Sequence, residues 1–163
     1  MDTLTPERRS YVMSRIRSEN TKPERIVRSW LHRAGFRFRI HVKTLPGHPD
    51  IVLPKYRTVL EVRGCFWHRH AHCAMASTPK SNVAFWKAKF ARNVARDAKH
   101  EEEWLALGWN VLIVWECELA PAKREETFAF IRAFLDSLLA DADEDAGTAA
   151  YAAEADAEYD AKK

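Results

Sequence analysis

The segment from Thr58 to Cys73, TVLEVRGCFWHRHAHC, constrains the fold more than any other part of the chain. It begins with an apolar run that has the residue types of a β-strand, and it breaks at Gly64. Two cysteines, three histidines and the adjacent Phe66 and Trp67 then follow within nine residues. A strand that ends in metal-ligand residue types, with large aromatic side chains between them, predicts a functional site in the middle of a domain.

Hydrophobic periodicity in the rest of the chain predicts a mixed α/β fold. Thr21 to Glu24 has the spacing of a capping box, and the alternating FRFRIHV of residues 36–42 is typical of a half-buried strand. The continuous apolar run NVLIVWE is typical of a central strand covered on both faces. The order of elements predicts a mixed sheet flanked by helices. We expect helices at about 6–18, 21–35, 83–107 and 122–140, and strands at 36–42, 51–53, 58–63 and 110–116.

Charge and composition limit the class of partner. The length predicts one domain, at 1–140, followed by an Ala-rich acidic tail at 141–163 that is expected to be disordered. The tail carries eight acidic and two basic residues, so the net charge of +3 leaves +9 on residues 1–140. That excess favours a nucleic acid as partner, with a well-solvated basic surface as the alternative. We expect no membrane span, MDTLTPERRS lacks the apolar region of a signal peptide, and three cysteines do not fit a disulfide framework, so we expect a cytoplasmic protein.

The hairpin predicted from the strands at 51–53 and 58–63 carries candidate catalytic carboxylates. Asp50 begins its first strand, and Glu61 lies in the second. Carboxylate and carbonyl oxygens on neighbouring strands are hard ligands for Mg²⁺, which activates water and stabilises the charge that grows on a phosphodiester. The alternative is an Asp50 that caps a turn and a Glu61 that faces solvent.

The cysteines and histidines predict a structural zinc site. Cys65, His70 and Cys73 lie in one loop, and Cys117 follows the last predicted strand. Four soft or borderline ligands suit a closed tetrahedral Zn²⁺ site, which would join the loop to the end of that strand. His72 competes with His70 as a ligand, and buried cysteines with surface histidines are the alternative to a metal site.

Three further features suit DNA. His68 is the histidine least needed for zinc, so it is free to act as an acid, a base or a phosphate contact. Phe66 and Trp67 are candidates to wedge between bases or, alternatively, to pack in the core, as is Trp86. The predicted helix within residues 1–20 is rich in arginine and has a thin apolar stripe, which favours an arm that lies on a duplex.

Four motifs, in order along the chain, resemble those of the very short patch repair (Vsr) DNA mismatch endonucleases. They are LPGHPD at Asp50, GCFWH at the start of the cysteine loop, FW…K…NV.RD in the long helix and GW.VLIVWEC at Cys117. The resemblance extends from Met13 to Cys117 and implies a restriction-endonuclease-like fold. It also implies a Mg²⁺-dependent nick on the 5′ side of the thymine in T:G mismatches, which arise when 5-methylcytosine deaminates.

The same resemblance implies roles for individual residues. Asp50 matches the metal-binding catalytic carboxylate, His68 the histidine that helps to activate the attacking water, and Glu24 an acidic residue near the metal-bound waters. The residues that match the structural zinc ligands are Cys65, His70, Cys73 and Cys117. The residues that match DNA contacts are Met13 and Ile16 in the N-terminal helix, the inserting aromatics Phe66, Trp67 and Trp86, and the minor-groove contacts Lys89 and Asn93.

The chain departs from the family pattern at the end of the second hairpin strand. Val62 stands where the best-known pattern has a threonine that contacts the metal through its carbonyl, and a carbonyl survives that change. Arg63 stands where the pattern has a histidine, and Glu61 is a further candidate Mg²⁺ ligand. Glu24 is also explained by helix capping alone.

The leading hypothesis is therefore a mismatch-specific nicking endonuclease with catalytic Mg²⁺ and structural Zn²⁺. The expected partner is double-stranded DNA with a T:G mismatch, with links to mismatch-repair proteins, a repair polymerase and a cytosine methyltransferase. We expect a bacterial, cytoplasmic monomer without a membrane contact. The alternatives are a non-catalytic, zinc-stabilised DNA-binding module and a restriction-type nuclease that cuts matched DNA.

Overall fold

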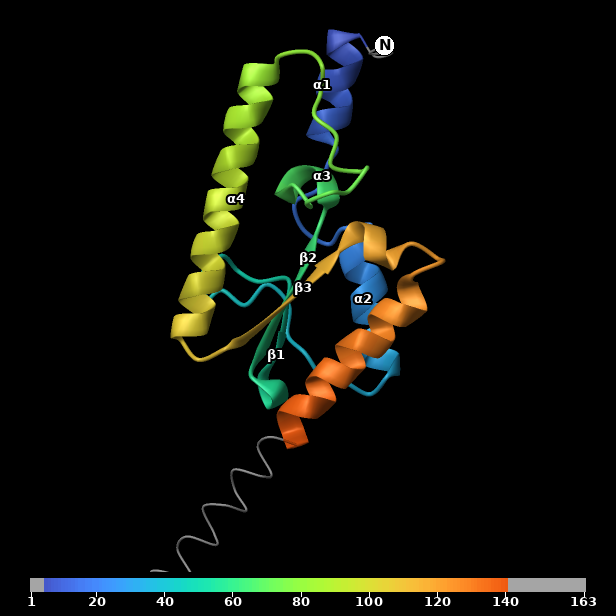
Figure 1. Ribbon diagram of the computed structural model, residues 1–163, viewed down its shortest axis with the longest axis vertical. Coiled ribbons are helices and arrows are strands. Elements are labelled where there is room, and N and C mark those ends of the chain that lie inside the picture. The colour runs from blue at the N-terminus through green and yellow to red at the C-terminus, as the bar shows by residue number, and fades with distance from the viewer. Residues whose placement is uncertain (1–4, 141–163) are drawn as a thin grey trace, which may run out of the picture. The chain divides into compact units, whose positions relative to one another are not determined.

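A three-stranded mixed sheet lies at the centre of the computed structural model, which describes residues 5–140 (Figure 1). β1 pairs with β2 in the antiparallel sense, and β2 pairs with β3 in the parallel sense. The predicted mixed sheet flanked by helices is confirmed. The strands are β1 (Ile51–Leu53), β2 (Thr58–Arg63) and β3 (Asn110–Trp115). The helices are α1 (Pro6–Ser14), α2 (Lys22–Arg33), α3 (Cys65–His68) and α4 (Val83–Ala106), with 3-10 turns η1 (Pro54–Tyr56) and η2 (Glu116–Leu119).

Strand register builds a core between the sheet and α4. Val52 pairs with Val59, and Val59 pairs with Val111, so the three side chains lie side by side on one face of the sheet. The Trp104 ring from α4 packs into the same cluster as Val52 and Val59. Its indole N–H donates to the carbonyl oxygen of Pro46 at 2.8 Å, which satisfies the polar atom of a buried ring.

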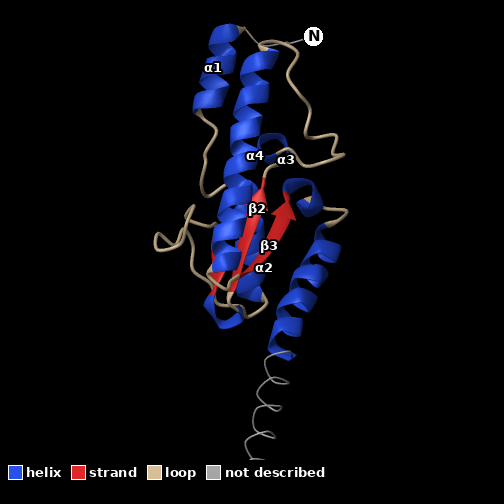
Figure 2. Cartoon of the chain, turned by 60° about the vertical axis from the view of Figure 1, so that its left-hand side comes forward, coloured by secondary structure: helices blue, strands red, loops and turns tan. Residues whose placement is uncertain are grey.

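The other face of the sheet is turned toward α2. Both views place α2 and α4 on opposite sides of the sheet (Figures 1 and 2). Ile51 pairs with Leu60, and Leu60 pairs with Leu112, and all three are buried on this face. Val27 and Leu31 of α2 are fully buried. Each such aliphatic side chain contributes about 1.5–3 kcal/mol through the removal of its surface from water.

Capping residues start the first two helices where the sequence predicts. The Thr5 hydroxyl oxygen accepts from the Arg8 N–H, and Thr21 and Glu24 form a reciprocal capping box. α1 ends at Ser14, so the expected extension to residue 18 is wrong. Residues 10–20 are all exposed, and without an apolar face to bury, further helical turns gain no support from packing.

The strand expected at residues 36–42 does not form. Only Arg39 bridges to Val52, through two backbone hydrogen bonds of 2.8 Å. β1 offers only three residues before Pro54, and His41 takes a left-handed conformation with φ of 46°, which ends the extended chain. Burial follows the alternating pattern only from Phe36 to Arg39, because Ile40 is 45% exposed.

Two further differences concern β3 and the cysteine loop. β3 lies at the end of the strand order, and β2 is the central strand, so the expectation of a central β3 is wrong. Its apolar run reflects burial on both faces, because every residue of β3 is buried or half-buried. Residues 65–68, expected as loop, form α3, which ends at Arg69 with φ of 57°.

The described residues divide into two compact units, one up to residue 124 and one from residue 125 onward. Residues 124–140 form the helix expected at 122–140, with Phe128, Ile131 and Leu135 at helical spacing. The single domain at 1–140 stays a prediction, and the acidic tail at 141–163 lies outside the described residues. Within residues 5–140, no helix has the length and apolar character needed to cross a bilayer.

Candidate active site and metal centre

A cleft of about 620 Å³ in the first unit gathers side chains that are distant in sequence. Nine of the predicted site residues line it: Ile16, Glu24, Asp50, Glu61, Val62, Trp67, His68, Lys89 and Asn93. Other lining residues, which the sequence did not single out, include His41, His48, Arg96, Asp97, His100 and Glu116. Met13, Phe66 and Trp86 are not among the lining residues.

The β1–β2 hairpin places Asp50 and Glu61 together. Because Ile51 pairs with Leu60, the residues just outside this pair meet at the end of β1. The Asp50 N–H donates to Glu61 Oε1 at 3.1 Å, and the Val62 N–H donates to Asp50 Oδ2 at 2.9 Å. The antiparallel register therefore holds both carboxylates at the cleft.

Burial of these two carboxylates raises their pKa values. Burial raises the pKa of Asp50 to about 6, aided by the Glu24 charge and opposed by the bond from Val62 and by Arg28. Burial, together with the Asp50 charge, raises the pKa of Glu61 to about 8. Two adjacent carboxylates with too little positive charge around them are stabilised by a hard divalent cation. The donor set thus fits Mg²⁺.

Glu24 is held as a fully hydrogen-bonded carboxylate beside this pair. Its side chain is 3% exposed, and Oε1 accepts from the Thr21 N–H and hydroxyl. Oε2 accepts from the Asn20 N–H at 2.9 Å and from Arg28 Nη2 at 2.6 Å. Glu24 therefore caps α2 and lines the cleft at once. Arg28, four residues further along α2, also donates to the Asp50 carbonyl oxygen at 3.4 Å.

A histidine–aspartate pair faces the carboxylates. His68 Nδ1, in α3, lies 2.6 Å from Asp97 Oδ2, in α4. Burial acts to raise the pKa of Asp97, but the bond from His68 and the charges of Arg63 and Arg96 outweigh it and hold the pKa below its usual range. Asp97 is the last residue of the NV.RD motif, and the sequence alone did not predict a role for it. Its place four residues after Asn93, on the same helical face, is the signal that could have identified it.

The predicted DNA-facing aromatics form a packed group between α3 and α4. Phe66 contacts Trp67, Trp86 and Phe90 edge-on, with ring centroids 5.0, 5.7 and 5.1 Å apart. Trp86 is only 8% exposed, whereas Trp67 lines the cleft. Trp86 is thus a buried member of the group and Trp67 is its member at the cleft, and insertion between bases stays a prediction.

Lys89 and Asn93 join this aromatic group to the cleft. Lys89 Nζ lies 5.1 Å from the centre of the Trp67 ring, within cation–π range. The Asn93 side-chain amide donates to the Trp67 carbonyl oxygen at 3.1 Å. Both residues also line the cleft. Lys89 and Asn93, one turn apart on α4, therefore contact α3 at Trp67 and present an ammonium and an amide group beside its ring.

The N-terminal segment contributes an exposed apolar and basic surface. Met13 is 38% exposed and Ile16 is 46% exposed. The guanidinium groups of Arg8 and Arg15 lie 5.7 and 5.1 Å from the Tyr11 ring centre. Of the two predicted contacts in this segment, only Ile16 lines the cleft.

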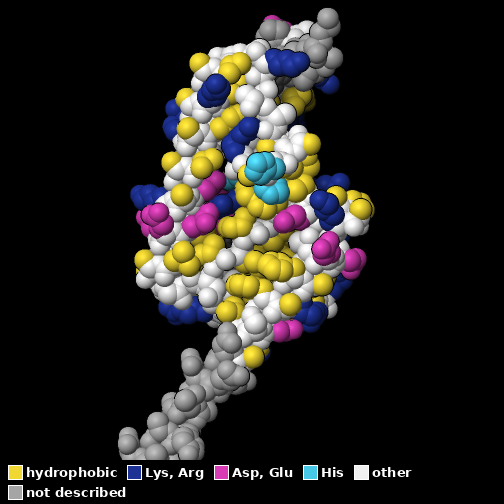
Figure 3. All heavy atoms as spheres, in the orientation of Figure 1, with side chains coloured by type: hydrophobic (Ala, Val, Ile, Leu, Met, Phe, Trp, Pro, Cys, Tyr) yellow, Lys and Arg dark blue, Asp and Glu magenta, His cyan; other side chains and the backbone are white. Residues whose placement is uncertain are grey.

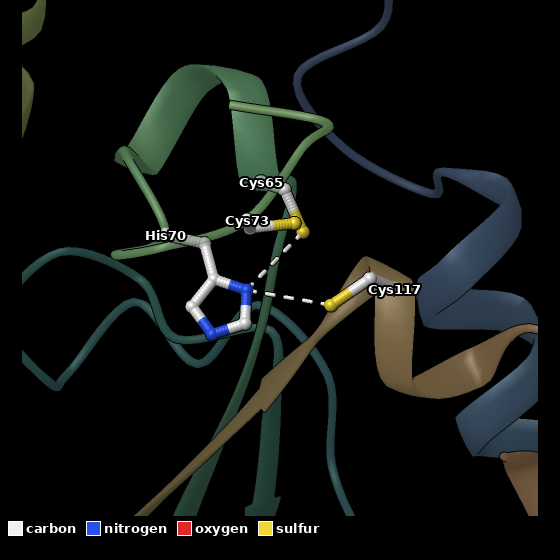
Figure 4. Close-up of side chains that lie close together, drawn as sticks. All are labelled: Cys65, His70, Cys73 and Cys117. Atoms are coloured by element: carbon white, nitrogen blue, oxygen red, sulfur yellow. Dashed lines mark hydrogen bonds between the residues drawn. The ribbon is translucent and has the colours of Figure 1, made fainter. Parts of the chain in front are cut away.

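The predicted zinc ligands converge in the fold (Figure 4). One ligand atom from each of Cys65, His70, Cys73 and Cys117 lies within 4.8 Å of the other three. His70 Nδ1 lies 3.6 Å from Cys65 Sγ and 3.3 Å from Cys117 Sγ. Around a tetrahedral Zn²⁺ with bonds of about 2.0–2.3 Å, neighbouring ligand atoms are about 3.3–3.8 Å apart. The cluster has the donor types and spacing to hold this ion.

His70, and not His72, belongs to the cluster. His72 is exposed, has φ of 57° and contributes no atom to the group. The His70 ring stacks on Trp115 with centroids 4.2 Å apart and planes at 4°. On the face shown in Figure 3, histidine side chains gather over the segment that carries α3. Burial raises the pKa of the Cys65 thiol to about 12, so a thiolate there needs a cation.

A mixed sheet that carries two carboxylates on a hairpin, with a histidine beside them, is the arrangement of a DNA endonuclease with a restriction-endonuclease-like fold. A family model described as "DNA mismatch endonuclease Vsr" matches residues 1–75. The DNA mismatch endonuclease Vsr of Escherichia coli is 42% identical over 111 residues, which are 68% of this chain and 70% of the relative. The chain belongs to the Vsr family of DNA mismatch endonucleases, as its motifs indicated.

Other relatives carry names that describe strand nicking. The Type II nicking enzyme V.XorIIP of Xanthomonas oryzae pv. oryzae is 53% identical over 119 residues, which are 73% of this chain and 87% of the relative. The Type II nicking enzyme V.NmeAIP of Neisseria meningitidis is 48% identical over 118 residues, 72% of this chain and 84% of the relative. The predictions of an endonuclease and of DNA as its partner are confirmed.

Proposed function

We propose that the protein nicks one DNA strand on the 5′ side of the thymine in a T:G mismatch and requires Mg²⁺. The observation that supports this most is the lining of one cleft. Asp50 and Glu61, the His68–Asp97 pair and the Trp67–Lys89–Asn93 group all reach it, so DNA probing and hydrolysis share one cavity. The names of the relatives as nicking enzymes support single-strand cleavage.

Asp50 and Glu61 hold the metal in this proposal, with the Val62 carbonyl as a further ligand. When bound there, Mg²⁺ lowers the pKa of water and stabilises negative charge on the phosphodiester. The hydrogen bond from the Val62 N–H fixes one oxygen of Asp50, which leaves the other oxygen for the ion. Arg28 and the helix cap hold Glu24 nearby, where its carboxylate orients water.

His68 takes the proton from the attacking water. Its Nδ1–H donates to Asp97, so the Nε2 lone pair is the acceptor that remains. The water oxygen forms a bond to phosphorus as one phosphorus–oxygen ester bond breaks. The oxygen of that broken bond stays on the leaving nucleotide and becomes the new strand end. Asp97 stabilises the imidazolium formed in this step, because its carboxylate stays ionised.

The aromatic group and α1 recognise the mismatch. Trp67 stacks on or wedges between bases, with Phe66 and Trp86 behind it, and Lys89 and Asn93 contact the minor-groove edges of the T:G pair. Met13 and Ile16 contact the duplex from the N-terminal segment. The cysteine–histidine cluster holds a structural Zn²⁺, which fixes α3 against the end of β3.

The cellular setting follows from the substrate. T:G pairs from deaminated 5-methylcytosine require a cytosine methyltransferase as their source and a repair polymerase after the nick. We therefore propose a cytoplasmic enzyme that acts with such a methyltransferase and with mismatch-repair proteins, and that binds DNA as a monomer.

The test uses a T:G duplex with randomised flanking sequence, incubated with Mg²⁺ or with EDTA. Wild-type protein should give one EDTA-sensitive nick, 5′ of the thymine, and Asp50→Ala should abolish it while DNA binding persists. Unchanged nicking by Asp50→Ala would refute the assignment of this residue. Binding without any nick would favour a non-catalytic DNA-binding module, and cleavage of both strands of matched DNA would favour a restriction-type nuclease.

A further inference from the structure

Arg63, which stands where the family pattern has a histidine, is a buried cation next to the proposed metal site. Its side chain is 8% exposed, and Nη1 lies 2.7 Å from Glu101 Oε1. Its Nε is buried and has no hydrogen-bond partner among the described residues. The guanidinium group is therefore paired with one carboxylate through Nη1, and its Nε is left without a partner among the described residues.

The fold places this pair against the catalytic groups. Glu61 and Arg63 are two residues apart on β2, so they share one face of the strand. Asp97 and Glu101 are four residues apart on α4, so they share one face of the helix. The ion pair between Arg63 and Glu101 joins these faces, and the Arg63 charge acts to lower the pKa of both Glu61 and Asp97.

Stability does not explain the Arg63–Glu101 pair. Removing the Arg63 guanidinium group from water costs free energy that its attraction to the partly exposed Glu101 carboxylate returns only in part, and a buried apolar side chain of the same shape often does as well. An unsatisfied buried Nε adds to that cost. The pair is better explained by the charge that it brings to the site.

We propose that Arg63 and Glu101 form a charge pair that sets the affinity of the Asp50–Glu61 site for its divalent cation. Arg63 repels the cation and weakens its binding, and Glu101 offsets the Arg63 charge and restores part of the affinity. This inference rests on the proposed Mg²⁺ site. It adds a pair of positioning residues that touch neither the metal nor the DNA.

The proposal predicts changes of opposite sign for the two partners. Arg63→Met removes a positive charge beside Glu61, so it should tighten divalent-cation binding by about fivefold, which corresponds to about 1 kcal/mol. Glu101→Gln leaves Arg63 without its counter-charge, so it should weaken binding by about the same factor. The double variant should return close to wild type. A pair that only supports the structure would weaken binding in both single variants.

The experiment titrates the zinc-loaded full chain with Mn²⁺, without DNA, and counts free Mn²⁺ by electron paramagnetic resonance. Arg63→Lys keeps the charge and should bind Mn²⁺ as the wild type does. Glu103→Gln is the matched control for Glu101→Gln, because it removes the same charge from α4 at a pair with the exposed Lys99, 3.8 Å away. It should leave the affinity unchanged.

The outcomes separate this inference from the proposed function. Mn²⁺ binding that is abolished by Asp50→Asn supports the metal site, and opposite shifts in Arg63→Met and Glu101→Gln then support the charge pair. Same-sign shifts, or no shift, overturn the charge pair and leave the site intact. If Arg63→Met does not fold, Arg63→Gln, which also removes the charge but stays polar, takes its place, because Glu101→Gln weakens binding under both explanations. No Mn²⁺ binding by wild type overturns the metal site and the charge pair together.

Discussion

Replacement of Asp97 by asparagine tests whether the His68–Asp97 pair takes part in nicking. Asparagine keeps the shape of the side chain but removes the negative charge that faces His68 Nδ1 at 2.6 Å. The neutral amide no longer stabilises a protonated imidazole, and it can present an N–H to the ring in place of an acceptor. His68 should then lose its orientation and part of its basicity, while the DNA-contacting residues keep their places.

The size of the effect follows from the kind of bond lost. A hydrogen bond to a charged group contributes about 1.5–3 kcal/mol, and the Asp97 side chain is only 10% exposed, so solvent screens little of it. We expect the rate constant for nicking to fall about 10- to 150-fold. The apparent Kd for the T:G duplex should change by less than about twofold, because Asp97 acts on the step that transfers the proton.

Single-turnover nicking of an end-labelled T:G duplex, with enzyme in excess, measures this rate constant apart from product release. Glu103→Gln, one to two turns further along α4, is the control for a lost carboxylate and should nick at the wild-type rate. His68→Ala and the His68→Ala/Asp97→Asn double variant should be equally slow, because Asp97 acts through His68. A wild-type rate in Asp97→Asn, or fully additive losses in the double variant, would refute the reasoning.

Three further changes test other parts of the molecule. Cys117→Ser should lose the approximately one Zn²⁺ expected per chain and much of the folding free energy, as metal analysis and thermal unfolding would show; a stable metal-free protein would contradict the zinc site. Trp67→Ala should weaken T:G binding by about 1–3 kcal/mol in a fluorescence-anisotropy titration while changing the urea midpoint little. Unchanged binding with a clearly lower urea midpoint would show that Trp67 is a core residue instead. Gly47→Ala should destabilise the fold by about 1–3 kcal/mol in urea, since Gly47 has φ of 69° and a Cβ there would overlap the His100 ring; an unchanged midpoint would show that the loop relaxes freely.

Local chemistry made much of the fold predictable from sequence. The capping box at Thr21 and Glu24 is a property of four neighbouring residues, and it forms as expected. The hairpin is also local, and its register alone brings Asp50 beside Glu61. The cysteine and histidine cluster was predictable because these residue types have few other uses so close together, although the sequence left His70 and His72 as alternatives.

Contacts that depend on tertiary packing were not predictable in the same way. The pairing of Arg63 with Glu101, and of His68 with Asp97, depends on where α4 crosses the sheet, which no local pattern specifies. The failed strand at 36–42 has the same origin, because its partner β1 is too short to pair with it beyond Arg39. The place of β3 at the edge of the sheet was not predicted, because an apolar run indicates burial and says nothing about how many strands lie beside it.

The parallel pairing of β2 with β3 has a consequence for how the enzyme becomes active. Arg63 pairs with Trp115, so Cys65 and Cys117 each stand two residues beyond the last paired position of their strand. A zinc ion bound to both would connect the two strand ends, and a slip of one residue would move one cysteine by about 3.3 Å relative to the other. Zinc binding would thus favour the correct register of β2 and β3, which are far apart in sequence. The Asp50–Glu61 hairpin forms locally, but His68 lies three residues after Cys65 in α3, so zinc binding would fix this histidine at the cleft.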